Sequence, residues 1–242
     1  MNPNSKESLL EHQKRIKEKT FLNKIYVSFY QIFADTKFPK GKIIEIGSGG
    51  GFLKKFIPSI ITSDVIDGPN IDKVFYCDKM PFKKSSVAAI LMVDVLHHIK
   101  NPQKAFQEME RCLVKGGKII MIEPYASIWG TLIYKYFHPE RKGFNANGGW
   151  KINGTGRMSD ANPAMTWVIF KRDRKIFEKK FPNLKIISFI PHTPIRYLIS
   201  GGLSKFQLLP TVFYPLILFL EKKLTVFNNK IGMFVTIELK KL

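Results

Sequence analysis

The chain has 242 residues, of which 45% are hydrophobic, so it can bury a sizeable core, and its composition excludes wholesale disorder. It carries 39 lysine and arginine residues against 19 aspartate and glutamate residues, a formal net charge of +20, which fits either a polyanionic partner or a lysine-rich background composition. Two cysteines, Cys77 and Cys112, exclude a secreted disulfide framework, and with a charged N-terminus that lacks an apolar signal core they favour a cytoplasmic protein.

The first 40 residues predict a helical segment ahead of the main domain. Residues 1–20 are charged and have the composition of a helix. Apolar residues then recur at helical spacing and predict an amphipathic helix that ends before Pro39. These residues are Phe21, Leu22, Ile25, Phe29, Ile32 and Phe33. We expect this helix to pack on the main domain, and a lid over the active site is the alternative.

From Lys42 onward, short apolar runs alternate with helical stretches. Strands are predicted over residues 42–46, 60–63, 73–76, 88–93, 118–122, 184–190 and 233–239. One helix is predicted to open at residues 52–56 and another to span residues 102–113, before a turn at Lys115-Gly116-Gly117. Such alternation is typical of a parallel sheet covered on both faces. The predicted fold is therefore α/β, with a Rossmann-like, mostly parallel seven-stranded sheet in a domain over residues 41–242.

The regular alternation breaks after Pro124. We predict a cap at about 125–182, inserted after the fifth strand, with helical stretches at 131–137 and 167–180. An apolar segment at about 200–220 contains Pro210 and Pro215 and is too short to span a bilayer. Burial of this segment against the main domain is the default expectation. The alternative is that it lies at an anionic bilayer surface, assisted by the positive charge of the chain.

A glycine-rich turn follows the first predicted strand, in the pattern Glu45-x-Gly47-x-Gly49-x-Gly51. A strand that leads into such a turn lets a ligand approach the backbone closely, because glycine has no Cβ. The dinucleotide fingerprint needs another glycine three residues after Gly49, and Phe52 stands there instead. The turn therefore indicates a nucleotide-like ligand without the dinucleotide pattern.

Acidic residues stand at the ends of successive predicted strands. Glu45, Asp64 and Asp94 end the first, second and fourth strands, and Asp78 follows the third. In an open parallel sheet, ligands bind at the carboxyl ends of the strands. A carboxylate at the end of the second strand can accept two hydrogen bonds from a ribose diol. Four acids at one sheet edge of a basic protein predict a ligand site there.

Residues 42–123 resemble the core of class I S-adenosylmethionine-dependent methyltransferases, in particular the type 11 or ubiquinone-biosynthesis-like branch. The run I-I-E-I-G-S-G-G-G is similar to the first motif of that family, and C-D-K-M-P-F at residues 77–82 to its acidic-x-x-Pro-Phe segment. V-D-V-L-H-H-I at residues 93–99 resembles its V-L-H-H-V signature, and L-V-K-G-G-K its L-x-P-G-G turn. Ala88 stands where the family often has aspartate. The resemblance covers about a third of the chain.

The resemblance implies the cofactor S-adenosyl-L-methionine and a set of residues that bind it. These are Glu45, Gly47, Ser48, Gly49, Gly51, Asp64, Asp78, Met80 and Asp94. The glycine turn would contact the methionine part, and Glu45 would orient the ammonium group. Asp64 would hold the ribose hydroxyls, and Asp94 would line the methionine end. Asp78 would accept a hydrogen bond from the adenine amino group while Met80 packs on the ring.

The acceptor is expected under the segment at about 125–205. His138, with Glu140 nearby, is a candidate general base, and His192 is the rival candidate. A structural role is an equal expectation for each histidine. Arg196 is expected either to hold a phosphate or carboxylate or to lie on a solvated face. We expect no metal centre.

The predicted function is S-adenosylmethionine-dependent methyl transfer to a small-molecule, lipid or lipid-linked glycan acceptor, with O-, N- and C-methylation left open. One alternative is an NAD-dependent or nucleotide-sugar oxidoreductase on a Rossmann sheet, which the glycine spacing disfavours. Another is a non-catalytic S-adenosylmethionine-binding module. Methylation of base amino groups is disfavoured because D-V-L-H replaces the N/D-P-P-Y/F motif after the fourth strand. The expected partners are a small-molecule or lipid substrate and an anionic membrane surface, rather than nucleic acid.

Overall fold

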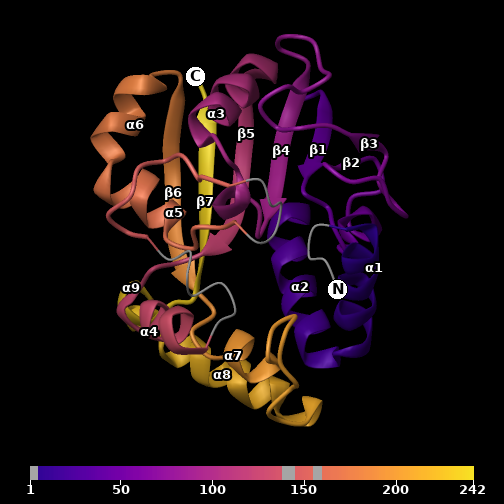
Figure 1. Ribbon diagram of the computed structural model, residues 1–242, viewed down its shortest axis with the longest axis vertical. Coiled ribbons are helices and arrows are strands. Elements are labelled where there is room, and N and C mark those ends of the chain that lie inside the picture. Colours follow the sequence, from indigo (N-terminus) through magenta and orange to yellow (C-terminus); the bar gives the residue numbers. More distant parts are fainter. Residues whose placement is uncertain (1–4, 138–144, 155–159) are drawn as a thin grey trace.

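The computed structural model describes residues 5–137, 145–154 and 160–242 (Figure 1). In this part of the chain one seven-stranded sheet has the order β3-β2-β1-β4-β5-β7-β6, with β7 antiparallel to its neighbours and the other strands parallel. The strands are β1 (Lys42–Ile46), β2 (Ile61–Asp64), β3 (Lys73–Val74), β4 (Val87–Val93), β5 (Leu113–Pro124), β6 (Leu184–His192) and β7 (Phe234–Lys241). The predicted α/β, mostly parallel, Rossmann-like fold is confirmed.

Strand β4 shows why the sheet is covered on both faces. It consists almost wholly of apolar residues that water does not reach. Ile90 and Met92 belong to the core on one face of the sheet, and Ala89 and Leu91 to the core on the other face. Side chains alternate between the two faces of a strand, so a continuous apolar run needs cover on both sides.

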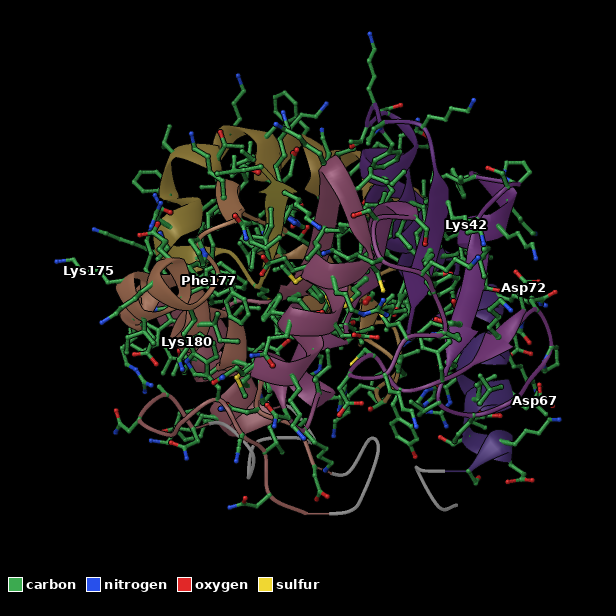
Figure 2. All side chains as sticks on the ribbon, turned by 90° about the horizontal axis from the view of Figure 1, so that it is seen from above. Lys42, Asp67, Asp72, Lys175, Phe177 and Lys180 are labelled. Atoms are coloured by element: carbon green, nitrogen blue, oxygen red, sulfur yellow. The ribbon has the colours of Figure 1, made fainter. Side chains whose placement is uncertain are left out.

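Within the described residues, four helical elements cover one face of the sheet: α3 (Pro102–Cys112), α5 (Met165–Trp167), the π-helical η4 (Val168–Arg172) and α6 (Arg174–Lys180). The ring centroids of Phe106 in α3 and Phe177 in α6 lie 5.3 Å apart in an edge-to-face arrangement. Lys175, also in α6, points away from the body (Figure 2). The later part of the segment at 125–182 thus packs on the sheet as the connection to β6.

The opposite face is covered by α2 (Thr20–Ala34), which follows α1 (Lys6–Glu18). The buried residues of α2 share one core with Leu91, Ile120 and Ile122 of the sheet; they are Phe21, Leu22, Ile25, Tyr26, Phe29, Tyr30 and Phe33. The expectation that this helix packs on the main domain is confirmed. Ile32, which was expected on the apolar face, is 37% exposed.

Beyond the carboxyl ends of the parallel strands, the described chain forms four helices: α4 (Ile128–Phe137), α7 (Arg196–Ser200), α8 (Tyr214–Lys223) and α9 (Asn228–Ile231). Helix α4 follows β5, and the other three connect β6 to β7, which starts from the same edge because it runs antiparallel. All four gather at the lower end of Figure 1. No helix in the described part of the chain has both the length and the apolar character needed to cross a membrane.

Two local predictions need correction. The helix expected to open at residues 52–56 is a single 3-10 turn, η1 (Leu53–Lys55), because Pro58 has no N–H group and disfavours a helical conformation at Ile57. The expected turn at Lys115-Gly116-Gly117 is a bulge within β5. Leu113 pairs with Val87 and Lys118 with Ala89, so the intervening residues loop out.

Helix α1 lies directly on the glycine-rich turn. A Cβ atom at Gly50 would lie 2.6 Å from the backbone nitrogen of Gln13 and 2.8 Å from its Cα. These atoms belong to the helix backbone and cannot rotate away. Glycine at position 50 is therefore needed for the close approach of α1 rather than for an unusual backbone angle.

Replacing Gly50 with alanine should push α1 off the turn. We expect Gly50→Ala to lower the free energy of unfolding by about 1–3 kcal/mol, the usual range for overpacking. Chemical denaturation would measure it. Gly149→Ala is the matched control, because nothing lies within 4 Å of its added Cβ. Equal stability of the two variants would show that α1 does not sit on the turn.

Candidate cofactor site

The turn after β1 is fixed to the neighbouring strand β2. Gly47 and Gly49 have φ angles of 69° and 48°, in the left-handed region that favours glycine. Between them, the Ser48 amide donates to the Ser63 carbonyl at 2.9 Å, and the Ser48 hydroxyl accepts from the Ser63 amide at 3.1 Å. The turn therefore continues the ladder between β1 and β2 and has a defined shape.

Asp64, at the end of β2, is held against this turn. Its Oδ2 accepts a hydrogen bond from the Gly49 amide at 3.0 Å, and its Oδ1 accepts from the Val65 amide at 2.7 Å. The side chain is buried. The structure thus brings together the glycine turn and the carboxylate that sequence reasoning placed in one site.

Two further predicted acids lie at the same sheet edge, Glu45 buried and Asp94 half-buried. Burial raises the pKa of Glu45 to about 7; a hydrogen bond from Ser48 opposes this shift, and the charge of Asp64 adds to it. Asp94 ends the run from β4 with a left-handed φ of 59°. Burial and the charge of Glu123 raise its pKa well above the usual value. Buried carboxyl groups are costly to ionise alone, so this edge favours a cationic ligand.

Helix α2 contributes two tyrosines that sequence reasoning missed. Burial raises the pKa of Tyr26 and of Tyr30, with the charge of Asp94 adding at Tyr26 and that of Glu45 at Tyr30. The Tyr30 hydroxyl accepts from the Phe52 amide at 3.4 Å and occupies the space of a Cβ at residue 51. Both tyrosines repeat at the helical spacing of the other buried residues of α2, so their sequence pattern indicated burial but not a site.

Glu123 is a further residue that sequence reasoning missed. Its Oε1 accepts from the Val95 and Leu96 amides, both at 2.7 Å, and its Oε2 shares a 2.8 Å hydrogen bond with His97 Nδ1. Burial raises the pKa of Glu123 to about 7 and lowers that of His97 to about 3, so His97 is neutral at pH 7. The fully buried Glu123 therefore holds the segment after β4 in place. The sequence did contain a signal for Glu123, because it is an acidic residue near the end of the fifth predicted strand. Asp94 was identified by the same kind of position, at the end of the fourth strand.

That segment leads into the 3-10 turn η2 (Leu96–His98) and closes against the glycine turn. The side chain of Val95 fills the space that a Cβ at Gly47 would need. The V-L-H-H signature thus has a structural explanation here. Its backbone amides and first histidine bind Glu123, and this arrangement sets the position of Asp94 beside the turn.

The two residues expected near the adenine differ in their surroundings. Asp78 is exposed in a turn beyond β3. Met80 is 4% exposed and belongs to the core on the α3 side, where its amide donates to Glu108 Oε1 at 2.9 Å. Their roles toward adenine stay predictions.

The candidate bases fall in two places. His138 and Glu140 lie outside the described residues. His192, at the end of β6, forms hydrogen bonds through Nδ1 with the Thr193 hydroxyl at 2.8 Å and through Nε2 with the Thr236 hydroxyl at 2.9 Å. Burial, assisted by the charge of Arg196, lowers the pKa of His192 to about 3. This is the setting of a neutral histidine held in one orientation.

Arg196 is neither solvated nor presented to a ligand, so both expectations for it are wrong. Its guanidinium forms a buried ion pair with Glu221 and donates to the Tyr214 hydroxyl at 2.8 Å. The two charged groups attract each other strongly where water is excluded. Across residues 5–137, 145–154 and 160–242, no group of three or more His, Cys, Asp or Glu side chains is arranged to hold a metal ion.

The raised pKa of Glu45 makes stability depend on pH. Its usual value is 4.5 and its folded value is about 7, so the folded state binds more protons between these values, and stability falls as pH rises through them. Glu45→Gln should flatten this slope by up to roughly 1.4 kcal/mol per pH unit. Urea unfolding from pH 5 to pH 8 measures it, with the exposed Glu178→Gln as control. An unchanged slope in Glu45→Gln would contradict the assignment.

Removing the Glu123 side chain should leave buried donors without an acceptor. We expect Glu123→Ala to lower the free energy of unfolding by about 3 kcal/mol or more, since each unsatisfied group costs roughly 1–3 kcal/mol. Glu123→Gln keeps an oxygen for the Val95 and Leu96 amides and should cost about 1 kcal/mol. Denaturant unfolding distinguishes the two. Equal losses would mean that these amides do not depend on residue 123.

Comparisons with known proteins agree with this geometry. Residues 70–121 match the family described as "Methyltransferase domain". The fold is similar to that of an S-adenosylmethionine-dependent methyltransferase of Thermotoga maritima, described as a possible histamine N-methyltransferase. The TM-score is 0.55 and the identity 18%, over 97% of this chain and 99% of that one. No curated protein sequence matches the chain.

A second solved structure of similar fold is the geranyl diphosphate C-methyltransferase of Streptomyces coelicolor A3(2). It is in complex with Mg²⁺, geranyl diphosphate and S-adenosyl-L-homocysteine. The TM-score is 0.50 and the identity 14%, over 96% of this chain and 85% of that one. The match over residues 70–121 and the similarity of fold agree with the resemblance of the chain to the class I S-adenosylmethionine-dependent methyltransferases.

Proposed function

We propose that the protein transfers the methyl group of S-adenosylmethionine to a small-molecule acceptor with an apolar, lipid-like part. The observation that carries the proposal is the junction of the glycine turn with Asp64, where the Gly49 amide donates to the carboxylate. This junction stands at the carboxyl edge of the sheet, beside the buried Glu45 and the half-buried Asp94.

The residues at this edge fit the chemistry of the cofactor. When bound, S-adenosylmethionine supplies a methyl group activated on a cationic sulfonium, next to an ammonium group. Glu45 and Asp94 have raised pKa values because they are buried, and a nearby positive charge would favour their ionised forms. Asp64, oriented by two backbone amides, would accept from the ribose hydroxyls. The residues Gly47 and Gly49 would let the ligand reach the backbone.

The chain then has mainly to position the acceptor, because an activated methyl group needs alignment more than proton transfer. A general base is required only where the acceptor loses a proton. His138 with Glu140 and, separately, His192 remain our candidates for that step. His192 would have to release its hydrogen bond with Thr193 or Thr236 to act. The geometry around it therefore favours catalysis by positioning.

An apolar acceptor is supported by what lies beyond the carboxyl edge. Helices α4 and α8 cover this edge with many exposed apolar side chains, among them Ile128 and Phe219. A prenylated acceptor also suits the fold, since the Streptomyces enzyme of similar fold is a geranyl diphosphate C-methyltransferase. The acceptor class that we propose is a lipid, a prenylated small molecule or a lipid-linked glycan.

Calorimetric titration tests the cofactor assignment. We expect S-adenosylmethionine and S-adenosylhomocysteine to bind and NAD not to bind, because the turn lacks the dinucleotide spacing. Asp64→Asn keeps an oxygen for the Gly49 amide but loses the charge that would hold the ribose, so its Kd should rise at least about tenfold. Asp67→Asn is the control, since that side chain is 77% exposed (Figure 2). Equal affinity of both variants would refute the assignment.

Transfer of a radiolabelled methyl group to lipid extracts then tests the reaction. Labelled product in the organic phase, absent with Asp64→Asn, is the expected result. Tight cofactor binding with no transfer to lipids, prenylated compounds or glycan precursors would identify a binding module instead.

A further inference from the structure

Exposed apolar side chains are concentrated at one end of the molecule. In the described residues, 20 large hydrophobic side chains are exposed, and 12 of them lie in α4 or between residues 206 and 227. We call these 12 residues the apolar end: Ile128, Leu132, Tyr136, Phe206, Leu208, Val212, Phe213, Leu216, Phe219, Leu220, Val226 and Phe227. Three of them, Phe206, Val212 and Val226, are between 78% and 80% exposed. Exposed apolar surface concentrated in this way marks an interaction site.

Helix α8 already packs on the body through one side, and its exposed apolar residues lie on the other side. Its inner side is fixed: Tyr214 and Ile217 are buried, and the Glu221 carboxylate accepts from the Ile195 and Arg196 amides at 2.8 and 2.7 Å. Its outer side is also apolar, with Phe219 exposed. A surface helix ordinarily turns a polar face outward. The body therefore holds α8 rigidly and presents an apolar face to the surroundings.

The exposed charges of this end all have one sign. Residues 126–137 and 193–236 contain a single carboxylate, Glu221, and it is buried in its ion pair with Arg196. The exposed charged side chains of these two segments are lysines: Lys135, Lys205, Lys222, Lys223 and Lys230. Two of them border exposed rings, with the Lys223 Nζ 5.4 Å from the Phe219 ring and the Lys135 Nζ 5.4 Å from the Tyr136 ring.

Apolar side chains rimmed by lysines match one surface in particular. An anionic bilayer accepts apolar groups below its headgroups and attracts lysines at their level. An acidic protein partner would pair with the lysines but would not explain why so much apolar surface is exposed. We propose that the apolar end docks on an anionic phospholipid bilayer, with the body of the protein outside it.

Docking in this orientation would give an apolar acceptor a direct route to the site. The apolar end is built from α4, α8 and the segments around them, which lie beyond the carboxyl edge of the sheet, the edge at which the glycine-rich turn stands (Figure 1). As a route for the acceptor, the proposal rests on the proposed function. Bilayer binding itself does not require catalysis, so the two can fail separately.

Vesicle co-sedimentation of the full chain tests the proposal. The protein should sediment with vesicles of phosphatidylcholine and phosphatidylglycerol, and much less with phosphatidylcholine alone or at high salt. Lys222→Glu with Lys223→Glu should weaken binding at least tenfold. Lys175→Glu with Lys180→Glu makes the same charge change on the exposed side of α6, away from the apolar end, and should weaken it far less (Figure 2). Equal losses in the two double variants would overturn the proposal, because the net charge alone would then explain binding.

An apolar pair of variants separates insertion from simple charge attraction. Phe219→Ser with Val226→Ser should also lose at least tenfold in binding, while Ile176→Ser in α6, where the side chain is 49% exposed, should not. All these side chains are exposed, and circular dichroism checks that each variant is folded. Retained binding in the serine pair would overturn the proposal. A second result would also overturn it: no vesicle binding by the unaltered protein, together with concentration-dependent dimers that the serine pair abolishes. A second copy of the chain would then cover this end.

The Asp64→Asn variant distinguishes this proposal from the proposed function. It should bind vesicles like the unaltered protein while its affinity for S-adenosylmethionine falls. Vesicle binding without cofactor binding in the unaltered protein would refute the proposed function and leave the docking surface standing. Cofactor binding without vesicle binding would refute the docking surface and leave the proposed function standing.

Discussion

The hydrogen bond from the Gly49 amide to the Asp64 carboxylate is the contact on which the site depends. It joins the turn after β1 to the end of β2, two places that are separate in the chain and adjacent in the sheet. A carboxylate that accepts from backbone amides is fixed without any need for a long, flexible partner. The acidic group is thus oriented toward the sheet edge by the fold itself, and the left-handed glycines beside it leave the backbone open to a ligand.

Around this contact the protein gathers more carboxyl groups than it pairs with positive side chains. Glu45, Asp94 and Glu123 all have raised pKa values because they lie away from water. Glu123 is stabilised by two amides and His97, and Arg196 and Glu221 form their own pair elsewhere. A strongly basic chain therefore keeps its lysines outside and a compact acidic region inside. Such a distribution suits a small cationic ligand at the sheet edge and an anionic surface at the exterior.

Much of this could be predicted from sequence because its signals are local. The apolar run of β4 indicated a strand covered on both sides, and the order of Gly47, Asp64 and Asp94 indicated one sheet edge. What could not be predicted depends on contacts between distant segments. Tyr30 has the pattern of an ordinary helix-face residue until α2 is docked, and Arg196 that of a solvated residue until α8 supplies Glu221. The helix expected to open at residues 52–56 is only one turn long because Pro58 follows it, a local signal that the prediction did not use.

The contact between α1 and Gly50 couples the glycine-rich turn energetically to a segment near the C-terminal end of the chain. Lys19, at the end of α1, donates hydrogen bonds to the carbonyls of Gly202 and Lys205, and Arg15 donates to the Leu203 carbonyl at 2.7 Å. One short helix therefore touches both the glycine-rich turn and the segment leading to α8. By thermodynamic linkage, any ligand of the turn that changes the seating of α1 also changes the free energy of that distant segment, and the effect holds equally in the other direction.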